Sequence, residues 1–156
     1  IRLHNRLTGG MIYAVHHDEA MKAIKYFMEE NVKKWNVIKA KLDTGKLAVN
    51  LSGALLIDHC APEINLKGVD LTYAILKNTY MANSDLSGAH LREASLVNVD
   101  FSNSKMDKID FTNAHLMQVD FLRASLAGAY FIGIKLEDTN LSRGNIEGAI
   151  FKPVLN

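Results

Sequence analysis

The sequence lacks several features that define common protein classes. Its only cysteine is Cys60, so no disulfide can form within the chain and a disulfide-stapled secreted fold is excluded. No run approaches the roughly eighteen consecutive apolar residues of a membrane-spanning helix. The formal net charge is only +1, which does not indicate a strongly polyanion-seeking or strongly acidic protein.

Catalytic and metal-binding motifs are also missing. There is no phosphate-binding glycine loop and no nucleophile elbow. The histidines at 4, 16, 17, 90 and 115 show no spacing typical of metal ligands. His59 and Cys60 are adjacent, and we interpret them as a bulge or local irregularity and not as a thiol or metal site. We therefore expect a protein that is not an enzyme and that has no catalytic residue, cofactor, metal or small-molecule substrate.

The 156 residues, 48% of them hydrophobic, are sufficient for one sizeable core. Residues 1–48 hold nine basic against five acidic side chains, and residues 49–156 hold nine against twelve. The chain thus has a mildly basic front and a mildly acidic body.

An internal repeat of five residues organises the body of the chain. Every fifth residue from position 51 is apolar over twenty-one consecutive steps, which are Leu51, Leu56, Ala61, Leu66, Leu71, Leu76, Met81, Leu86, Leu91, Leu96, Phe101, Met106, Phe111, Leu116, Phe121, Leu126, Phe131, Leu136, Leu141, Ile146 and Phe151. The residue two places earlier is small or β-branched in every repeat except at His59. Since residues i and i−2 of an extended chain point to the same side, both are expected in the interior.

A period of five fits neither a helix nor a plain strand, so each repeat needs a corner. The outward positions carry many Asp, Asn and Gly residues, which are typical of turns. Segments such as Val69 to Tyr73, Ala89 to Glu93 and Ala114 to Gln118 resemble the A-(D/N)-L-x-x unit of the pentapeptide-repeat proteins. The resemblance covers about residues 49–153 and implies a mainly β fold, a right-handed quadrilateral β-helix with four repeats in each of about five coils.

Four repeats per coil place residues twenty apart on top of one another. The interior then sorts by face into rows of like side chains. We expect the structural core to contain Leu71, Leu91, Phe101, Phe111, Phe121 and Phe131.

Residues 1–48 do not follow the repeat. Asp18 as N-cap, apolar residues at spacings of three and four, and Gly45 as a stop predict one amphipathic helix over about 19–42. We expect this segment to cap the first coil. Its lysines, which include Lys33, Lys34, Lys39 and Lys41, are interpreted as a solvated face, with a basic binding stripe as the alternative. Its apolar stripe is expected to pack onto the β-helix, with a partner-binding or dimerising seam as the alternative, and includes Met21, Ile24, Met28 and Trp35.

One face of the predicted β-helix carries apolar residues at outward positions. These are Leu55, Ile57, Ile75, Val97 and Met117. An apolar patch of this kind marks either a docking site within the chain or a site for a partner. The N-terminal helix is long enough to lie along it, so both interpretations remain open at this stage.

The leading functional hypothesis is a scaffold or adaptor that binds an unidentified protein partner. Similar modules occur in secreted bacterial effectors, so we expect a cytoplasmic location or delivery into a host cell. No direct binding of nucleic acid or membrane is expected, and a homodimer could use an end coil or the apolar face. Some family members imitate duplex DNA and bind DNA gyrase, which is the alternative. Residues 49–156 carry a net charge of −3, whereas duplex DNA of a similar length carries roughly fourteen negative charges, so the imitation would be poor.

Overall fold

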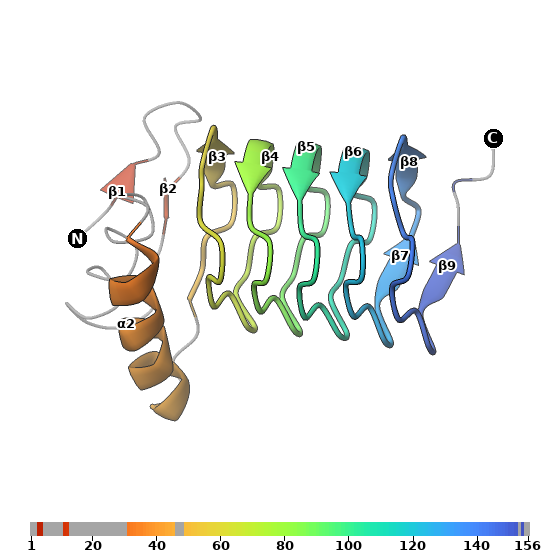
Figure 1. Cartoon of the computed structure of the whole chain (residues 1–156). Helices are drawn as coiled ribbons and strands as arrows, with labels where there is room; N and C mark the ends of the chain where they lie inside the picture. Colours follow the sequence, from red (N-terminus) through yellow and green to blue (C-terminus); the bar gives the residue numbers. More distant parts are fainter. Residues whose placement is uncertain (1–2, 5–10, 13–30, 46–48, 153, 155–156) are drawn as a thin grey trace.

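The computed structural model describes residues 3–4, 11–12, 31–45, 49–152 and 154. From Asn50 onward the chain winds into a β-helix, with helix α2 (Val32–Thr44) at its N-terminal end (Figure 1). Strands β1 (Leu3–His4) and β2 (Met11–Ile12) form a separate antiparallel pair. The predicted mainly β solenoid of about five coils is confirmed.

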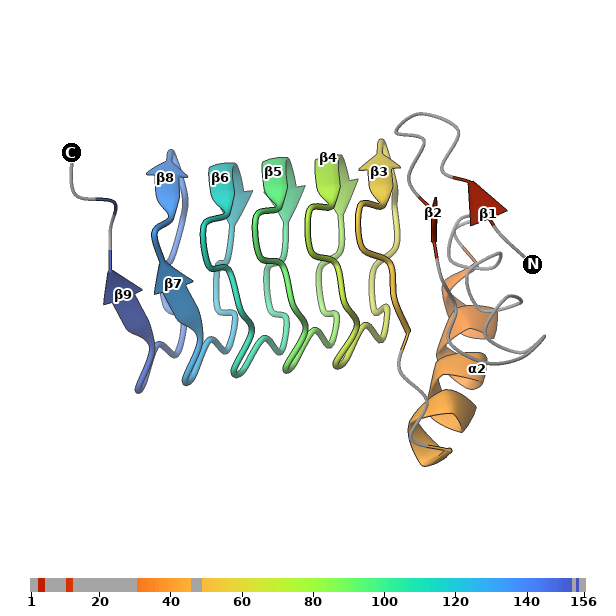
Figure 2. The ribbon, with the colours of Figure 1, turned by 180° about the vertical axis from the view of Figure 1, so that it is seen from behind.

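One face of the solenoid is a parallel sheet of five strands. They are β3 (Leu55–Ile57), β4 (Ile75–Tyr80), β5 (Ser95–Asp100), β6 (His115–Asp120) and β8 (Lys135–Glu137), in that order. A neighbouring face ends in the parallel pair β7 (Tyr130–Ile132) and β9 (Ile150–Lys152), which is well seen from behind (Figure 2). Elsewhere single bridges between coils replace longer strands.

The register shows four repeats per coil. Leu56 pairs with Leu76, Leu76 with Leu96 and Leu96 with Leu116, each a step of twenty residues. We name the faces by their interior rows: face A holds Leu71, Leu91, Phe111, Phe131 and Phe151, face B holds Leu56 to Leu136, face C holds Ala61 to Leu141, and face D holds Leu66 to Ile146.

The corners lie at one fixed position of the repeat. Every fifth residue from Gly53 to Gly148 has a positive φ, between 47° and 71°. Glycine and asparagine adopt this conformation readily, but Tyr73, Arg123 and Arg143 adopt it too, although each such residue costs about 1–2 kcal/mol. The sheet hydrogen bonds of the neighbouring coils hold these corners in place.

The interior is apolar and stacked. The predicted core residues Leu71, Leu91, Phe101, Phe111, Phe121 and Phe131 are all fully buried. Four phenylalanines stack in pairs, with centroids 5.8 Å apart for Phe101 and Phe121 and 5.4 Å apart for Phe111 and Phe131. The rows are therefore continuous from coil to coil.

The few polar groups in the interior bond to the backbone. The Thr79 hydroxyl donates to the carbonyl of Leu56, and the Ser104 hydroxyl donates to the carbonyl of Met81. The Ser84 hydroxyl accepts from the amide of Ile64. A buried hydroxyl costs stability only when it lacks a partner, so these positions are compatible with the core.

Helix α2 closes the N-terminal end of the β-helix. Trp35 is fully buried, and its Nε1 donates to the carbonyl of Asn65 at 2.5 Å. The Asn36 side chain donates to the carbonyl of Glu63 at 2.9 Å and accepts from the amide of Asn65 at 2.7 Å. These bonds satisfy backbone groups of the first coil that have no described coil beneath them.

The prediction of one continuous helix over 19–42 is wrong. Asn31 is the N-cap of α2, has non-helical dihedral angles, and its side chain accepts from the amide of Lys34. Residues 19–30, half of the predicted helix, lie outside the described residues. The helix ends at Thr44 with Gly45 as C-cap. Lys39, expected on the solvated face, is buried and forms an ion pair with Asp43.

The last coil departs from the expectation that every fifth residue is buried. Leu136, Ile146 and Phe151 are 43%, 47% and 41% exposed, although they continue the interior rows. No further coil of the described chain stacks on them. An interior residue of a solenoid is buried only where another coil stacks on it. The five-residue pattern is the same in every coil, so it does not distinguish these residues from buried ones.

Candidate interaction surface

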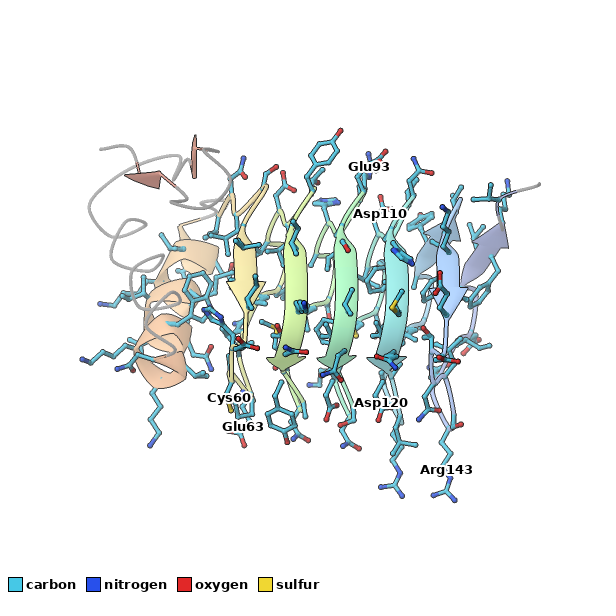
Figure 3. All side chains as sticks on the ribbon, turned by 90° about the horizontal axis from the view of Figure 1, so that it is seen from above. Cys60, Glu63, Glu93, Asp110, Asp120 and Arg143 are labelled. Atoms are coloured by element: carbon cyan, nitrogen blue, oxygen red, sulfur yellow. The ribbon has the colours of Figure 1, made fainter. Side chains whose placement is uncertain are left out.

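The five predicted surface residues lie on one sheet. Leu55 and Ile57 are on β3, Ile75 is on β4, Val97 is on β5 and Met117 is on β6, all with side chains on the outer side of face B. Figure 3 looks onto this face and shows the strands side by side. Ile57 and Ile75 are each 38% exposed, and the other three are half-buried.

The register arranges these residues in two parallel rows. In the first row Leu55 pairs with Ile75, and in the second row Ile57 and Val97 flank Lys77, with Met117 beyond Val97. We call these five apolar residues the face B patch. Adjacent strands are about 4.8 Å apart, so the patch extends over the first four coils, with Lys77 inside it.

The face B patch ends where the outward positions become polar. The first row becomes polar at Ser95 and His115, and on β8 both rows are polar, with Lys135 and Glu137. His115 Nε2 lies 3.1 Å from a carboxylate oxygen of Glu137, so part of this polar end is internally paired. The face is thus apolar near the N-terminal end of the solenoid and charged near its C-terminal end.

Helix α2 does not lie along the face B patch. It runs across the N-terminal end of the first coil, and its buried side chains are Trp35, Ile38, Lys39 and Leu42 (Figures 1 and 3). Its thirteen residues pack against the end of the core, where the unpaired edge and apolar cross-section offer more contact than a flat sheet. Helix α2 therefore does not cover the face B patch.

A shallow groove runs along the corner between faces B and C. It has a volume of about 390 Å³ and is lined by Asn78, Thr79, Tyr80, Asn98, Val99, Asp100, Gln118 and Asp120. The amide of Asn98 donates to Asn78, and that of Asn78 donates to Asp58, at 3.0 and 2.8 Å. These side-chain bonds connect successive coils, so the groove wall has a structural role.

The comparison with known sequence families decides what this solenoid is. Residues 59–131 and 74–151 match the profile described as pentapeptide repeat region, and together these matches span more than half of the chain. The chain belongs to the pentapeptide repeat family. No curated protein matches its sequence significantly.

Solved pentapeptide repeat proteins are similar at low sequence identity. A protein of the Arabidopsis thaliana thylakoid lumen is 26% identical over 67% of this chain and 71% of its own, with a TM-score of 0.51. HetL, involved in heterocyst differentiation regulation in Nostoc sp. strain PCC 7120, is 25% identical over 66% of this chain, with a TM-score of 0.43. The chain covers 49% of HetL, about half its length.

QnrB1, a plasmid-mediated fluoroquinolone resistance protein, is 18% identical over 64% of this chain and 57% of its own, with a TM-score of 0.40. This likeness concerns the fold alone. Pentapeptide repeat proteins are in general structural and interaction scaffolds, so a role in protein interaction is plausible for this chain.

The outward aspartates of the pentapeptide repeats are turn-forming residues. The carboxylates of Asp70, Asp100 and Asp120 each accept a hydrogen bond from the backbone amide two residues later, at 2.7 to 2.9 Å. Such bonds stabilise the local turn. Asp100 and Asp120 are register neighbours, but each is occupied in this way, which is not the arrangement of an acid and base pair.

Asp110 is the most buried of these carboxylates, with 6% of its surface exposed. Burial raises the pKa of Asp110. The hydroxyl and amide of Thr112, at 2.6 and 2.9 Å, and the guanidinium of Arg92 lower it, and together they outweigh the effect of burial. The balance places the pKa of Asp110 below its ordinary value of 3.8. The ionised form is therefore bound more tightly in the folded chain than in the unfolded one.

Replacing Asp110 by asparagine is expected to remove an acid-dependent part of the stability. Because the folded pKa is lowered, this contribution is fully present above the unfolded pKa and is lost as the pH falls through the folded pKa. Urea unfolding of the wild type and Asp110→Asn should thus differ most at pH 7 and converge below about pH 4. Arg92→Met should reduce the same difference. A gap between wild type and Asp110→Asn that stays constant from pH 7 to pH 3 would contradict this account.

The repeat containing His59 and Cys60 is regular in its backbone. Cys60 pairs with Tyr80, and the corner residues Asp58 and Glu63 keep the positive φ of all other corners. The predicted bulge is therefore wrong. The large His59 side chain occupies the interior position without displacing the strand, and its Nε2 is buried without a hydrogen-bond partner. Cys60 is a free and exposed thiol.

Charges of both signs occur on every face. Faces A, B and C each carry three acidic and two basic side chains, and face D carries three of each. Figure 3 labels Glu63, Asp120 and Arg143 along one margin of the solenoid and Glu93 and Asp110 toward the other. No face of residues 49–152 is uniformly negative.

Two further negative findings concern the described residues alone. Between residues 31 and 152, without 46–48, no group of three or more His, Cys, Asp or Glu side chains is placed to hold a metal ion. No helix in the described part of the chain is long and apolar enough to span a membrane.

Sequence reasoning missed exposed aromatic residues next to the face B patch. Tyr80 ends β4 and is 43% exposed, and Tyr73 occupies a face A corner and is 61% exposed. Both stand at outward positions of the repeat, which could have identified them. Sequence reasoning also missed the exposure of three residues in the last described coil, because they fit the interior pattern; these are Leu136, Ile146 and Phe151.

Proposed function

We propose that this chain is a non-enzymatic protein-binding scaffold that binds its partner through the face B patch. The observation that carries the proposal is the run of apolar outward residues, from Leu55 to Met117, on a sheet that α2 leaves uncovered. Exposed contiguous apolar side chains are a common mark of interaction sites. Outward residues of the other faces are mostly polar.

The backbone beneath the face B patch supports this use. Strands β3 to β6 are joined by regular parallel hydrogen bonds, and their inner side chains Leu56, Leu76, Leu96 and Leu116 are fully buried. The outer side chains are therefore held at fixed spacing before any partner binds. A surface that is already ordered loses less conformational entropy on binding.

Lys77 indicates the chemical character of the partner surface. It is exposed and lies between Ile57 and Val97 in the second row of face B. An apolar partner surface that also carries a carboxylate opposite Lys77 satisfies both features. We infer a partner segment with apolar side chains around an acidic residue.

The alternative of a DNA mimic that binds gyrase is less well supported. Such a protein needs a continuous negative face, whereas faces A to D all carry both signs. A gyrase supercoiling assay tests it directly. Inhibition or protection of gyrase by the chain would favour the alternative.

Site-specific photocrosslinking tests the proposed surface. A photoreactive phenylalanine analogue is placed at Ile75 on face B and, as a matched control, at Asp85 on face D, which precedes an interior leucine in the same way. We expect a protein adduct from position 75 and not from position 85. The identified protein, once purified, should bind the wild type at least about tenfold more tightly than Ile75→Asp or Lys77→Glu. Equal adducts from both positions, or equal affinities, would contradict the proposal.

A further inference from the structure

The outward side chains of face B stand in two straight rows. From β3 to β6 each strand pairs with the next at a register of twenty residues, so equivalent positions lie directly side by side (Figure 3). The two rows of the face B patch are two residues apart along each strand, which is about 6.6 Å. The positions between the rows point inward and are fully buried; they are Leu56, Leu76, Leu96 and Leu116. One line of partner side chains can therefore lie between the rows.

A partner cannot bind to this part of the sheet by adding a strand. Strands β4, β5 and β6 are each hydrogen-bonded to a neighbouring strand on both sides. Strand addition needs an unpaired edge, and these strands have none. The partner must therefore bind through its side chains, and the spacing of those side chains has to match the spacing of the strands.

The spacing of the strands matches one side of an α-helix. Successive strands place equivalent side chains at about 0, 4.8, 9.6 and 14.4 Å along the solenoid. Helix residues i, i+3, i+7 and i+10 lie on one side and rise by about 0, 4.5, 10.5 and 15 Å. The two series stay within about 1 Å of each other over four coils. An extended chain in the same direction presents a side chain on one side about every 6.6 Å, so it is out of step by the second coil.

We propose that the partner segment on the face B patch is an amphipathic α-helix that lies along the solenoid axis, across strands β3 to β6. This inference rests on the proposed binding function and adds the conformation and the direction of the bound segment. The helix presents an apolar stripe with spacings of three, four and three residues, as in a heptad. Its stripe packs between the two rows of the face B patch, where each coil receives one side chain.

The polar positions of the two rows determine what flanks this stripe. Lys77 interrupts the second row on the second coil, so an acidic residue of the helix lies beside it and forms a charge-assisted hydrogen bond. Ser95 and His115 continue the first row on the third and fourth coils, so the flank of the helix that faces them is polar. The apolar contacts span three strand spacings, which a helix covers in about eleven residues.

Mapping of photocrosslinks tests the conformation of the bound segment. A photoreactive phenylalanine analogue is placed singly at Ile57, Val97 and Met117 of the full chain, which belong to the second row. Mass spectrometry then identifies the partner residue that each position crosslinks. We expect all three sites on one continuous segment. The sites of Ile57 and Val97 should be about six or seven residues apart, and those of Val97 and Met117 about three or four.

The crosslinked sites also separate this inference from the proposed function. Sites about three and then one or two residues apart would show an extended segment. Sites on separate segments would show an irregular contact surface. Either result would overturn the helix and leave the face B patch as the binding surface. If position 75 and the three mapped positions all give no adduct, the proposed function and the helix are both wrong.

A charge exchange tests the place of Lys77 beside the helix. Lys77→Glu is expected to weaken binding of the crosslinked partner at least about tenfold. Lysine in place of the partner's acidic residue between the sites of Ile57 and Val97 should restore binding to Lys77→Glu. Lys105→Glu is the matched control, because Lys105 is also exposed but lies on face D, and it should bind like the wild type. Circular dichroism checks that each variant is folded. A loss of binding that this exchange does not restore would overturn the assigned position of the helix.

Discussion

Replacing Phe111 by alanine is expected to lower the free energy of unfolding by about 3–5 kcal/mol. Phe111 is fully buried, its ring lies 5.4 Å from that of Phe131 and its edge meets Phe121 at 5.7 Å. The surrounding coils are fixed by their hydrogen bonds and cannot collapse into the cavity. In a solenoid each coil is stabilised mainly by its neighbours, so a cavity in the middle weakens both halves.

Phe151 provides a matched control in the same row of face A. It stacks on Phe131 at 4.6 Å but is 41% exposed. Phe151→Ala, measured by urea unfolding, should therefore lose less than half as much as Phe111→Ala. Equal losses for the two substitutions would show that stacking between coils is not what makes the interior phenylalanines important.

Replacing Trp35 by alanine is expected to cost a similar amount, about 3–5 kcal/mol. This change removes the largest side chain from the N-terminal end of the core and leaves the carbonyl of Asn65 without the indole donor. Trp35→Phe separates the two effects, since it keeps most of the packing and removes the hydrogen bond. We expect about 1–3 kcal/mol for this smaller change.

The control for Trp35 lies on the same helix. Val37 is 60% exposed, and Val37→Ala should change the stability by less than about 0.5 kcal/mol. Hydrogen exchange of the first coil gives a second measurement. The amides of residues 49–70 should exchange faster in Trp35→Ala than in the wild type, while those of β5 and β6 change less. If α2 could lose Trp35 without loss of protection in the first coil, it would not be a cap.

The fold could be predicted from the sequence because its signal repeats. Each repeat presents the same choice of an apolar residue, such as Leu71 or Phe111, and a small one two places earlier. Twenty-one repetitions leave little room for another period. The core residues followed directly, whereas four repeats per coil, and with them the number of about five coils, required the resemblance to a known family.

Single events in the chain could not be predicted in this way. The end of a helix at Asn31 depends on one cap, and the burial of Lys39 depends on its pair with Asp43 and the packing around it. Positive φ at Tyr73 and Arg143 contradicts local preference and is imposed by the coils above and below. The helix cap and the buried lysine occur once, so no pattern predicts them, and at the corners the residue types Tyr and Arg do not indicate a positive φ.

For the candidate site too, one part could be predicted from the sequence and another could not. The residues Leu55, Ile57, Ile75, Val97 and Met117 could be found from the sequence, because their outward positions follow from the repeat. Whether they are accessible depends on where α2 packs, and that is decided by contacts such as Trp35 with Asn65.

The sequence by itself determined the five-residue period, the composition of the interior and the outward rows of this pentapeptide repeat protein. Only the tertiary structure decided which end α2 covers and which face α2 leaves uncovered. The physical reason is that periodicity is a local property, which each repeat shows separately. The closing of an end depends on how a single non-repeating segment packs against surfaces that exist only once the coils have formed.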